Sequence, residues 1–252
     1  MKISTVIITK DRPEMLHRCL NSFTIQTEMP YEIIIVDSSA GSATKETVAS
    51  FNGKLPIHYL YQPQKGYSIA RNTGINYAGG DIIAFTDDDC IVDQNWVANI
   101  LHAHNKFTHA AGIGGKINSP KNANCIMRLA EWRNSISFDN FIKKNDFYNI
   151  YNINCSYKKE YLDKVGQFDE AIIKEGEDTD LNWRLCQKGY KVMYLPEIQV
   201  IHFQRSTFKS FMKQRFAYIK ASYVVSRKHP DFPVPCRDKI FFLFFKIFKV
   251  KI

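Results

Sequence analysis

Four short apolar segments within the first 90 residues restrict the fold more than any other feature of this chain. They cover residues 4–8, 32–36, 58–61 and 82–85. Helix-like sequences follow the first three segments and end near Thr24, Phe51 and Tyr77. Strands that are apolar throughout and alternate with helices are typical of a parallel sheet with helices on both faces. The pattern predicts an α/β fold with a doubly wound, mainly parallel sheet.

The first helix is predicted from the segment Asp11-Arg12-Pro13-Glu14. Asp11 has the spacing of an N-cap, Pro13 lies in the first turn, and Glu14 has the spacing of a capping box. In the second half we expect a helix over 178–188 closed by Gly189, a strand over 191–195, and a further strand segment over 200–202.

The domain organisation is predicted as one continuous fold with two halves and a tail. Residues 1–115 carry the alternating strands and helices, residues 116–205 are rich in aromatic residues and Asn, and residues 206–252 form a basic, aromatic tail. No linker rich in Pro, Gly or Ser separates the halves, so we expect them to share one fold.

Composition limits the cellular setting and the partners. The 34 basic and 25 acidic residues give a net charge of +9, which favours a polyanionic neighbour. The six cysteines contain no C-x-x-C pair, which favours reduced thiols in the cytoplasm over a disulfide framework. No export signal and no apolar run of the ~20 residues that a membrane span needs are apparent.

Three adjacent carboxylates, Asp87, Asp88 and Asp89, follow the fourth apolar segment directly. Further polar residues follow the first two segments: Thr9, Asp11 and Asp37. Ligands of doubly wound sheets bind beyond the carboxyl ends of the strands, so we expect these side chains to converge. Repulsion within the acidic trio favours a divalent cation that holds a diphosphate, whereas the alternative is a solvated acidic turn.

Six segments, in this order, are similar to motifs of family 2 glycosyltransferases with the GT-A fold. They are residues 5–12 (TVIITKDR), 35–39 (IVDSS), 66–74 (GYSIARNTG), 79–89 (GGDIIAFTDDD), 166–170 (GQFDE) and 176–181 (GEDTDL). The resemblance covers residues 3 to about 205. It implies an inverting transferase that uses a nucleotide-diphosphate sugar, with UDP favoured, a divalent metal, Mn²⁺ or Mg²⁺, and a hydroxyl of a glycan or lipid-linked acceptor.

The resemblance also implies roles for individual residues. Donor binding falls to Thr9, Asp11, Asp37, Arg71, Asp87 and Asp88, and metal binding falls to Asp89 and His202. Asp37 would accept from the base, and Asp87 or Asp88 would face the ribose. Asp11 as a helix cap and Arg71 as an ion-pair partner of the acidic trio are the alternatives. Ser38 and Ser39 depart from the family pattern, which leaves the base less defined.

The acidic turn before the predicted helix at 178 supplies the candidate base. By resemblance Asp178 takes the proton of the acceptor hydroxyl, and Glu177 is the alternative base. The helix dipole is expected to keep this carboxylate ionised at neutral pH. Asp180 faces away from Asp178 and is expected to support the fold.

The tail combines basic and aromatic residues over 205–228 with an apolar segment over 240–248. Lys239, Lys246 and Lys249 share a helical face there, so the tail is predicted to bind an anionic membrane surface from the cytoplasmic side. A buried terminal helix or a dimer contact is the alternative.

Two other classes of protein are alternatives to the transferase interpretation. A nucleotidyltransferase of related fold is expected to have a glycine-rich loop after its first strand, and residues 8–12 contain no glycine. A nucleic-acid-binding module explains the basic tail but not carboxylates that repel phosphates, so no nucleic-acid partner is expected.

Overall fold

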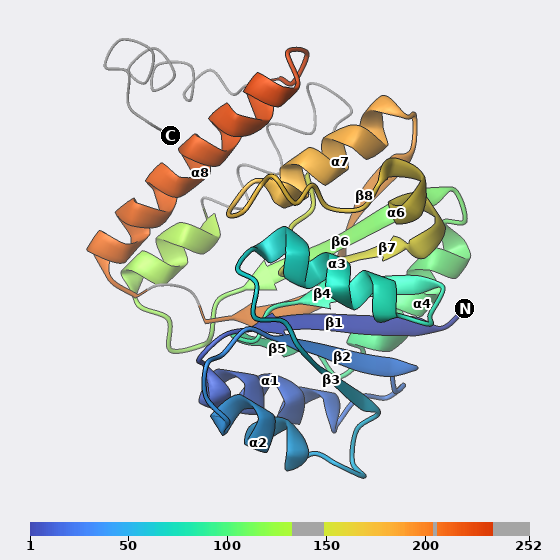
Figure 1. Cartoon of the computed structure of the whole chain (residues 1–252), viewed down its shortest axis with the longest axis vertical. Helices are drawn as coiled ribbons and strands as arrows, with labels where there is room; N and C mark the ends of the chain where they lie inside the picture. Colours follow the sequence, from blue (N-terminus) through green and yellow to red (C-terminus); the bar gives the residue numbers. More distant parts are fainter. Residues whose placement is uncertain (133–148, 204–205, 234–252) are drawn as a thin grey trace.

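The computed structural model describes residues 1–132, 149–203 and 206–233. Its centre is one eight-stranded sheet with the order β3-β2-β1-β4-β7-β6-β8-β5 (Figure 1). The strands are β1 Ile3–Thr9, β2 Glu32–Asp37, β3 Ile57–Tyr61, β4 Ile82–Thr86, β5 Cys90–Val92, β6 Ala110–Asn118, β7 Asn154–Lys158 and β8 Lys191–His202. The labelled helices are α1 Pro13–Phe23, α2 Ala43–Ala49, α3 Tyr67–Tyr77, α4 Trp96–Lys106, α6 Lys159–Val165, α7 Glu177–Gln187 and α8 Phe208–Lys228. Residues 125–132 are also helical.

The predicted parallel sheet is confirmed for its first half. Strands β3, β2, β1 and β4 pair in parallel, and β6 pairs in parallel with β8. Two strands run against this direction, because β7 is antiparallel to both β4 and β6, and β5 is antiparallel to β8. The segments predicted separately at 191–195 and 200–202 belong to the single strand β8, which has an irregular register against β6.

Successive residues of the central strands fill two apolar layers, one on each face of the sheet. In β2, Ile33 and Ile35 pack on the face covered by α1, α2 and α4, whereas Ile34 and Val36 pack under α3, α6 and α7 (Figure 1). Side chains alternate between the faces of a strand, so a strand buried on both faces must be apolar at every position. This is why β2 lacks the alternating pattern of a half-exposed strand.

A close contact fixes α3 against β1. A Cβ atom at Gly74 would lie 2.4 Å from Val6 Cγ1, so only glycine allows this approach without a shift of the strand or the helix. The contact holds α3 against β1, and Arg71 on α3 lies 3.6 Å from Asp87, just beyond the end of β4.

The predicted capping box at α1 is wrong. The N-cap is Arg12 and has no side-chain capping bond, whereas Pro13 does open the helix. Asp11 has a positive φ of 53°, and its Oδ1 accepts a 3.4 Å hydrogen bond from Ala40 N, so the side chain points to the β2–α2 loop. At α7, Gly176 is the N-cap and Gly189, with φ of 75°, follows the C-cap as predicted.

The tail is described only in part. Residues 208–228 form α8, whose Val225 is buried, and the apolar segment over 240–248 lies outside the described residues. Among the described helices, none combines the length and apolar character needed to cross a membrane. The membrane prediction for residues 239–252 therefore stays a prediction.

Candidate active site

The carboxyl ends of β1 and β4 bring Thr9 and the acidic trio together, as expected. Thr9 Oγ1 donates a 2.7 Å hydrogen bond to Asp88 Oδ2, and Arg12 Nη2 lies 2.7 Å from Asp88 Oδ1. Asp88 is fully buried, and burial raises its pKa to about 7 although Arg12 acts to lower it. Asp88 therefore binds the loop after β4 to Thr9 and Arg12 in the interior. Of the two carboxylates expected near a ribose, Asp87 is the accessible one, with 26% of its side chain exposed.

Arg71 is buried between two carboxylates. Its Nη1 lies 2.6 Å from Glu177 Oε1, and its Nη2 lies 3.6 Å from Asp87 Oδ1. Asn152 Nδ2 donates a 3.3 Å hydrogen bond to the same Glu177 oxygen. Arg71 thus forms an ion pair with a member of the trio, and it also joins the trio to the amino end of α7.

Asp37 lies at the end of β2 and is fully buried. Its Oδ1 accepts from Ser39 N at 2.8 Å, and its Oδ2 accepts from the Tyr59 hydroxyl at 2.8 Å. Ser39 Oγ in turn accepts a 2.7 Å hydrogen bond from Asp11 N. Burial and the bond to Asp37 raise the pKa of Tyr59 to about 12, so this hydroxyl remains a donor. Ser39, which departs from the family pattern, joins Asp11 to Asp37.

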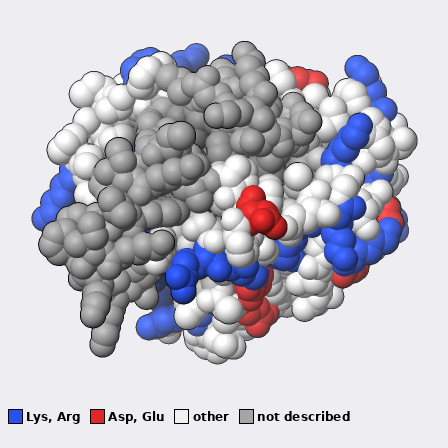
Figure 2. All heavy atoms as spheres, turned by 90° about the horizontal axis from the view of Figure 1, so that it is seen from above, with Lys and Arg blue, Asp and Glu red and all other residues white. Residues whose placement is uncertain are grey.

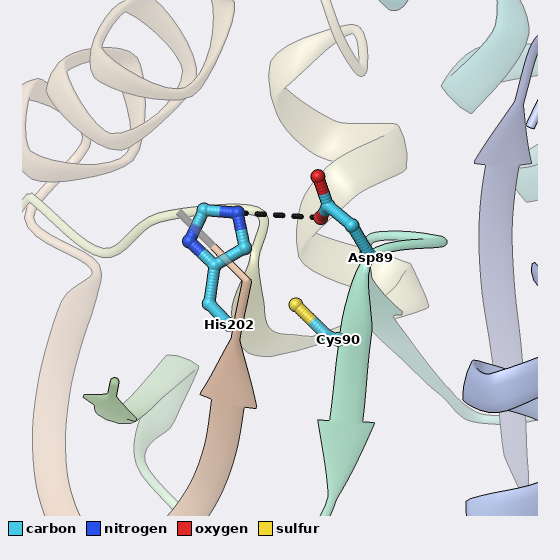
Figure 3. A group of neighbouring side chains, drawn as sticks. All are labelled: Asp89, Cys90 and His202. Carbon is cyan, nitrogen blue, oxygen red and sulfur yellow. Dashed lines mark ion pairs between the residues drawn. The ribbon is translucent and has the colours of Figure 1, made fainter. Parts of the chain in front are cut away.

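Asp89 and His202 come from the adjoining ends of β5 and β8, where Cys90 pairs with His202 (Figure 3). His202 Nε2 lies 3.2 Å from Asp89 Oδ1, and Arg12 Nη1 donates a 2.9 Å hydrogen bond to Asp89 Oδ2. Burial acts to raise the pKa of Asp89, but His202 and Arg12 hold it below its usual value. Burial acts to lower the pKa of His202, but contact with Asp89 raises it.

This pair has the donors that a divalent cation needs. No described residue gives Asp89 Oδ1 a well-aligned hydrogen bond, although the oxygen is buried beside His202. A carboxylate oxygen and an imidazole nitrogen suit Mn²⁺, and the carboxylate also suits Mg²⁺. The residues present therefore fit the metal that the resemblance implies.

Asp178 lies in the first turn of α7, beside Glu177. Its Oδ1 accepts a 2.7 Å hydrogen bond from Thr179 N. Burial, followed by the charge of Glu177, raises the pKa of Asp178 to about 7. The helix dipole is expected to keep this carboxylate ionised at neutral pH, but burial opposes the dipole and leaves it only partly ionised there. A pKa near 7 suits a group that accepts a proton at neutral pH.

Asp180 is buried and supports the packing of α7 against the end of α8. Its carboxylate lies 2.8 Å from Arg184 Nε, 2.6 Å from Lys228 Nζ and 2.8 Å from His229 Nε2. The structure thus places it in the supporting position expected from its spacing to Asp178.

Sequence reasoning missed three groups in this region. Arg12 contacts both Asp88 and Asp89, Asn152 contacts Glu177, and Tyr59 contacts Asp37. Arg12 lies inside a motif segment and Asn152 inside the Asn-rich stretch, so both carried a signal in the sequence. Tyr59 lies on β3 and carried none.

The outer surface agrees with the basic composition. On the face shown in Figure 2, Lys and Arg are spread over the described surface, whereas Asp and Glu form a few small groups. Most of the carboxylates named above lie in the interior or at the strand ends.

The chain is similar to known proteins. A family model described as Glycosyl transferase family 2 matches residues 4–166. The chain is 27% identical over 223 residues to the glycosyltransferase AglE of Haloferax volcanii, covering 85% of this chain and 70% of AglE.

Two solved structures share the fold. The mannosyltransferase PcManGT of Pyrobaculum calidifontis, in complex with GDP-Man and Mn²⁺, matches with a TM-score of 0.68 and 17% identity over 93% of this chain. S. aureus TarS 1–349 in complex with UDP-GlcNAc matches with a TM-score of 0.67 and 16% identity over 90% of this chain. The chain spans 66% of the length of each of these solved chains.

Proposed function

The chain belongs to glycosyl transferase family 2 and is a glycosyltransferase, and from this membership we propose that it transfers a sugar from a nucleotide-diphosphate donor to a hydroxyl of a glycan or lipid-linked acceptor. The observation that carries the proposal is the meeting of the acidic trio with His202 and, across Arg71, with Glu177, the residue next to Asp178. UDP is the proposed donor nucleotide, and polysaccharide biosynthesis is the proposed setting. The family match gives no support to a nucleotidyltransferase or a nucleic-acid-binding module.

The two halves divide the substrates. In the proposal, residues 1–115 hold the donor: Asp37 and Asp11 line the base pocket, and Asp87 faces the ribose. Thr9 and Asp88 hold the loop that carries these groups. Residues 116–205 hold the acceptor and the base. Because Arg71 touches both Asp87 and Glu177, it connects the two halves at the point where the substrates meet.

Asp89 and His202 would hold the divalent cation. A bound Mn²⁺ or Mg²⁺ offsets the negative charge that develops on the departing diphosphate. Arg12 already neutralises part of the charge on the trio, because it contacts both Asp88 and Asp89. The chain thereby keeps the acidic loop folded before any cation or donor arrives.

Asp178 supplies the proton acceptor for transfer with inversion. The acceptor hydroxyl loses its proton to Asp178 as its oxygen bonds to the anomeric carbon. On the opposite side the bond from that carbon to the diphosphate oxygen breaks, and the diphosphate leaves with the electron pair. Glu177, the alternative base, is engaged by Arg71 and Asn152, which favours Asp178 for the proton transfer.

Thermal unfolding with a panel of nucleotide sugars tests this function. With Mn²⁺ present, one nucleotide-diphosphate sugar should raise the unfolding temperature, and EDTA should abolish the rise because the cation links protein and diphosphate. Asp89→Asn should lose the metal-dependent rise while keeping its own unfolding temperature within a few degrees. A panel without any metal-dependent shift, or an unchanged shift in Asp89→Asn, contradicts the proposal.

The location of the enzyme follows from its acceptor. We place it in the cytoplasm, peripheral to the inner face of the membrane, where a lipid-linked acceptor is presented. The support is the net charge of +9 and the basic, aromatic composition of residues 205–228.

A further inference from the structure

A third ligand atom lies beside the proposed cation pair. The Cys90 Sγ, a carboxylate oxygen of Asp89 and a ring nitrogen of His202 all lie within 4.8 Å of one another (Figure 3). The pairing of β5 with β8 produces this arrangement, because Cys90 is directly opposite His202 in the antiparallel register. The thiol therefore points toward the space that Asp89 and His202 share.

The backbone around the thiol is held on both sides. Cys90 N donates a 3.1 Å hydrogen bond to Asp87 O, and Phe203 N donates a 3.1 Å hydrogen bond to Asp89 O. Cys90 itself is 1% exposed and packs in the apolar layer under α1 and α4. Its sulfur thus lies on the inner side of the site, whereas Asp89 and His202 lie on the outer side.

The donor set distinguishes soft cations from hard ones. Mg²⁺ and Mn²⁺ prefer oxygen ligands and gain little from sulfur, whereas Zn²⁺ and Cd²⁺ bind well to a set of thiolate, imidazole and carboxylate. We propose that Asp89, Cys90 and His202 form a three-ligand site for a soft divalent cation, Zn²⁺ or Cd²⁺. On binding, the cation replaces the thiol proton, which leaves to water, and a metal–sulfur bond forms without any change of oxidation state.

The consequence for the enzyme is competition between two classes of cation. This step rests on the proposed function, because Asp89 and His202 cannot serve a hard cation for the donor while a soft cation engages them. The sulfur draws the soft cation toward the apolar layer and away from the diphosphate. Zn²⁺ is therefore expected to inhibit transfer by displacing Mn²⁺.

The chain offers matched control thiols. Cys19 is buried in the same apolar layer, but its Sγ donates to Asp87 O at 3.6 Å and is not part of the three-ligand group. Cys125 is an exposed free thiol that will bind cadmium without the help of neighbouring ligands. Cys236 lies outside the described residues, so the experiment is done with the full chain in a background that carries both Cys125→Ser and Cys236→Ser.

Cadmium titration, followed by the ultraviolet charge-transfer absorption of the metal–thiolate bond, tests the site without any sugar donor. The background protein should develop the band with one equivalent of Cd²⁺, and Cys19→Ser should retain it. Cys90→Ser should lose the band, with Cys90→Ala as a second variant in case serine is poorly tolerated. His202→Gln should weaken cadmium binding at least about tenfold.

Manganese competition completes the test. The signal of free Mn²⁺ in electron paramagnetic resonance should rise when Zn²⁺ is added to the background protein, and Cys90→Ala should need at least about tenfold more Zn²⁺. A missing cadmium band, or a band that survives in both Cys90 variants, overturns the site. Because the band needs no nucleotide sugar, its failure is distinct from failure of the proposed transferase function.

Discussion

The carboxyl group of Asp178 is a much weaker acid than that of an exposed aspartate. Its pKa is raised from 3.8 to about 7, first by burial and then by the charge of Glu177. If Asp178 is the base, turnover should rise with pH around a midpoint near 7, because only the ionised form accepts a proton. The pH dependence of turnover at saturating substrate measures this midpoint, and a rate that is flat between pH 5 and pH 8 speaks against the assignment.

The raised pKa of Asp178 makes the folded chain less stable as the pH rises. Between about pH 4 and pH 7 the folded chain retains a proton that the unfolded chain has lost, so raising the pH favours unfolding. Asp178→Asn removes this penalty. The variant should therefore be more stable than the original chain at pH 8, and the difference should vanish toward pH 4. Urea unfolding at the two pH values measures it, and an equal difference at both pH values contradicts the shifted pKa.

Asp178→Asn also tests catalysis directly. Asn has nearly the same size but accepts no proton, so turnover should fall about 10²-fold or more while donor affinity is nearly unchanged. Glu177→Gln is the comparison, because this residue is the alternative base. A loss confined to Glu177→Gln would transfer the role of base to Glu177.

At the scale of residues, the sequence predicted which side chains belong to the site better than it predicted their burial and their pKa values. The convergence of Thr9 with the acidic trio followed from their places at strand ends, and it is confirmed. The burial of Asp88 and the raised pKa of Asp178 depend on which side chains cover them, and no local pattern contains that information. Cys90 lies beside His202 only because β5 pairs with β8, a strand late in the chain.

Two ion pairs with the same i,i+4 spacing differ in burial, and therefore in how much each is expected to stabilise the fold. In α6, Glu160 and Lys164 are 57% and 50% exposed, whereas in α7 Asp180 and Arg184 are 0% and 17% exposed. Asp180 also receives Lys228 and His229 from the end of α8. Asp180 therefore joins two helices through Lys228 and His229, whereas the Glu160–Lys164 pair joins only neighbouring turns of α6.

Asp180→Ala should lower the free energy of unfolding by ~3 kcal/mol, because it removes the buried carboxylate that Arg184, Lys228 and His229 share. Glu160→Ala should leave the unfolding midpoint unchanged, since water solvates both groups of that pair. Urea unfolding of both variants measures the contrast. Equal effects of the two substitutions would show that Asp180 does not hold α7 to α8.

At the scale of elements, the sequence predicted β1, β2, β3, β4 and β8, but it did not predict β5, β6 or β7. The segments that form β1, β2 and β4 are almost entirely apolar, so each strand could be predicted from its own sequence. The direction of β7 and β5 depends on partners far away in the chain, and so it could not be predicted. The capping box failed because Asp11 adopts a positive φ and turns to Ala40 instead of to α1.

For the whole molecule, the sequence predicts that residues 239–252 bind a membrane surface. Four of the five residues 241–245 are Phe, and nearby lysines should each contribute up to ~1 kcal/mol near anionic lipid. Deleting 239–252 should abolish sedimentation with anionic liposomes and leave hydrolysis of the nucleotide sugar in solution unchanged. Loss of the unfolding transition in the truncated chain would instead assign the tail to the core.

The pairing of Cys90 with His202 joins residues that are 112 positions apart in the chain. A ribosome that adds about 5–20 residues per second needs roughly ten seconds to make the intervening segment. A nascent chain therefore displays Asp89 before His202 exists. Arg12, however, has left the ribosome earlier still, and its contacts with Asp88 and Asp89 depend only on strands already made. During synthesis Arg12 is therefore available to neutralise Asp88 and Asp89 before His202 has been made.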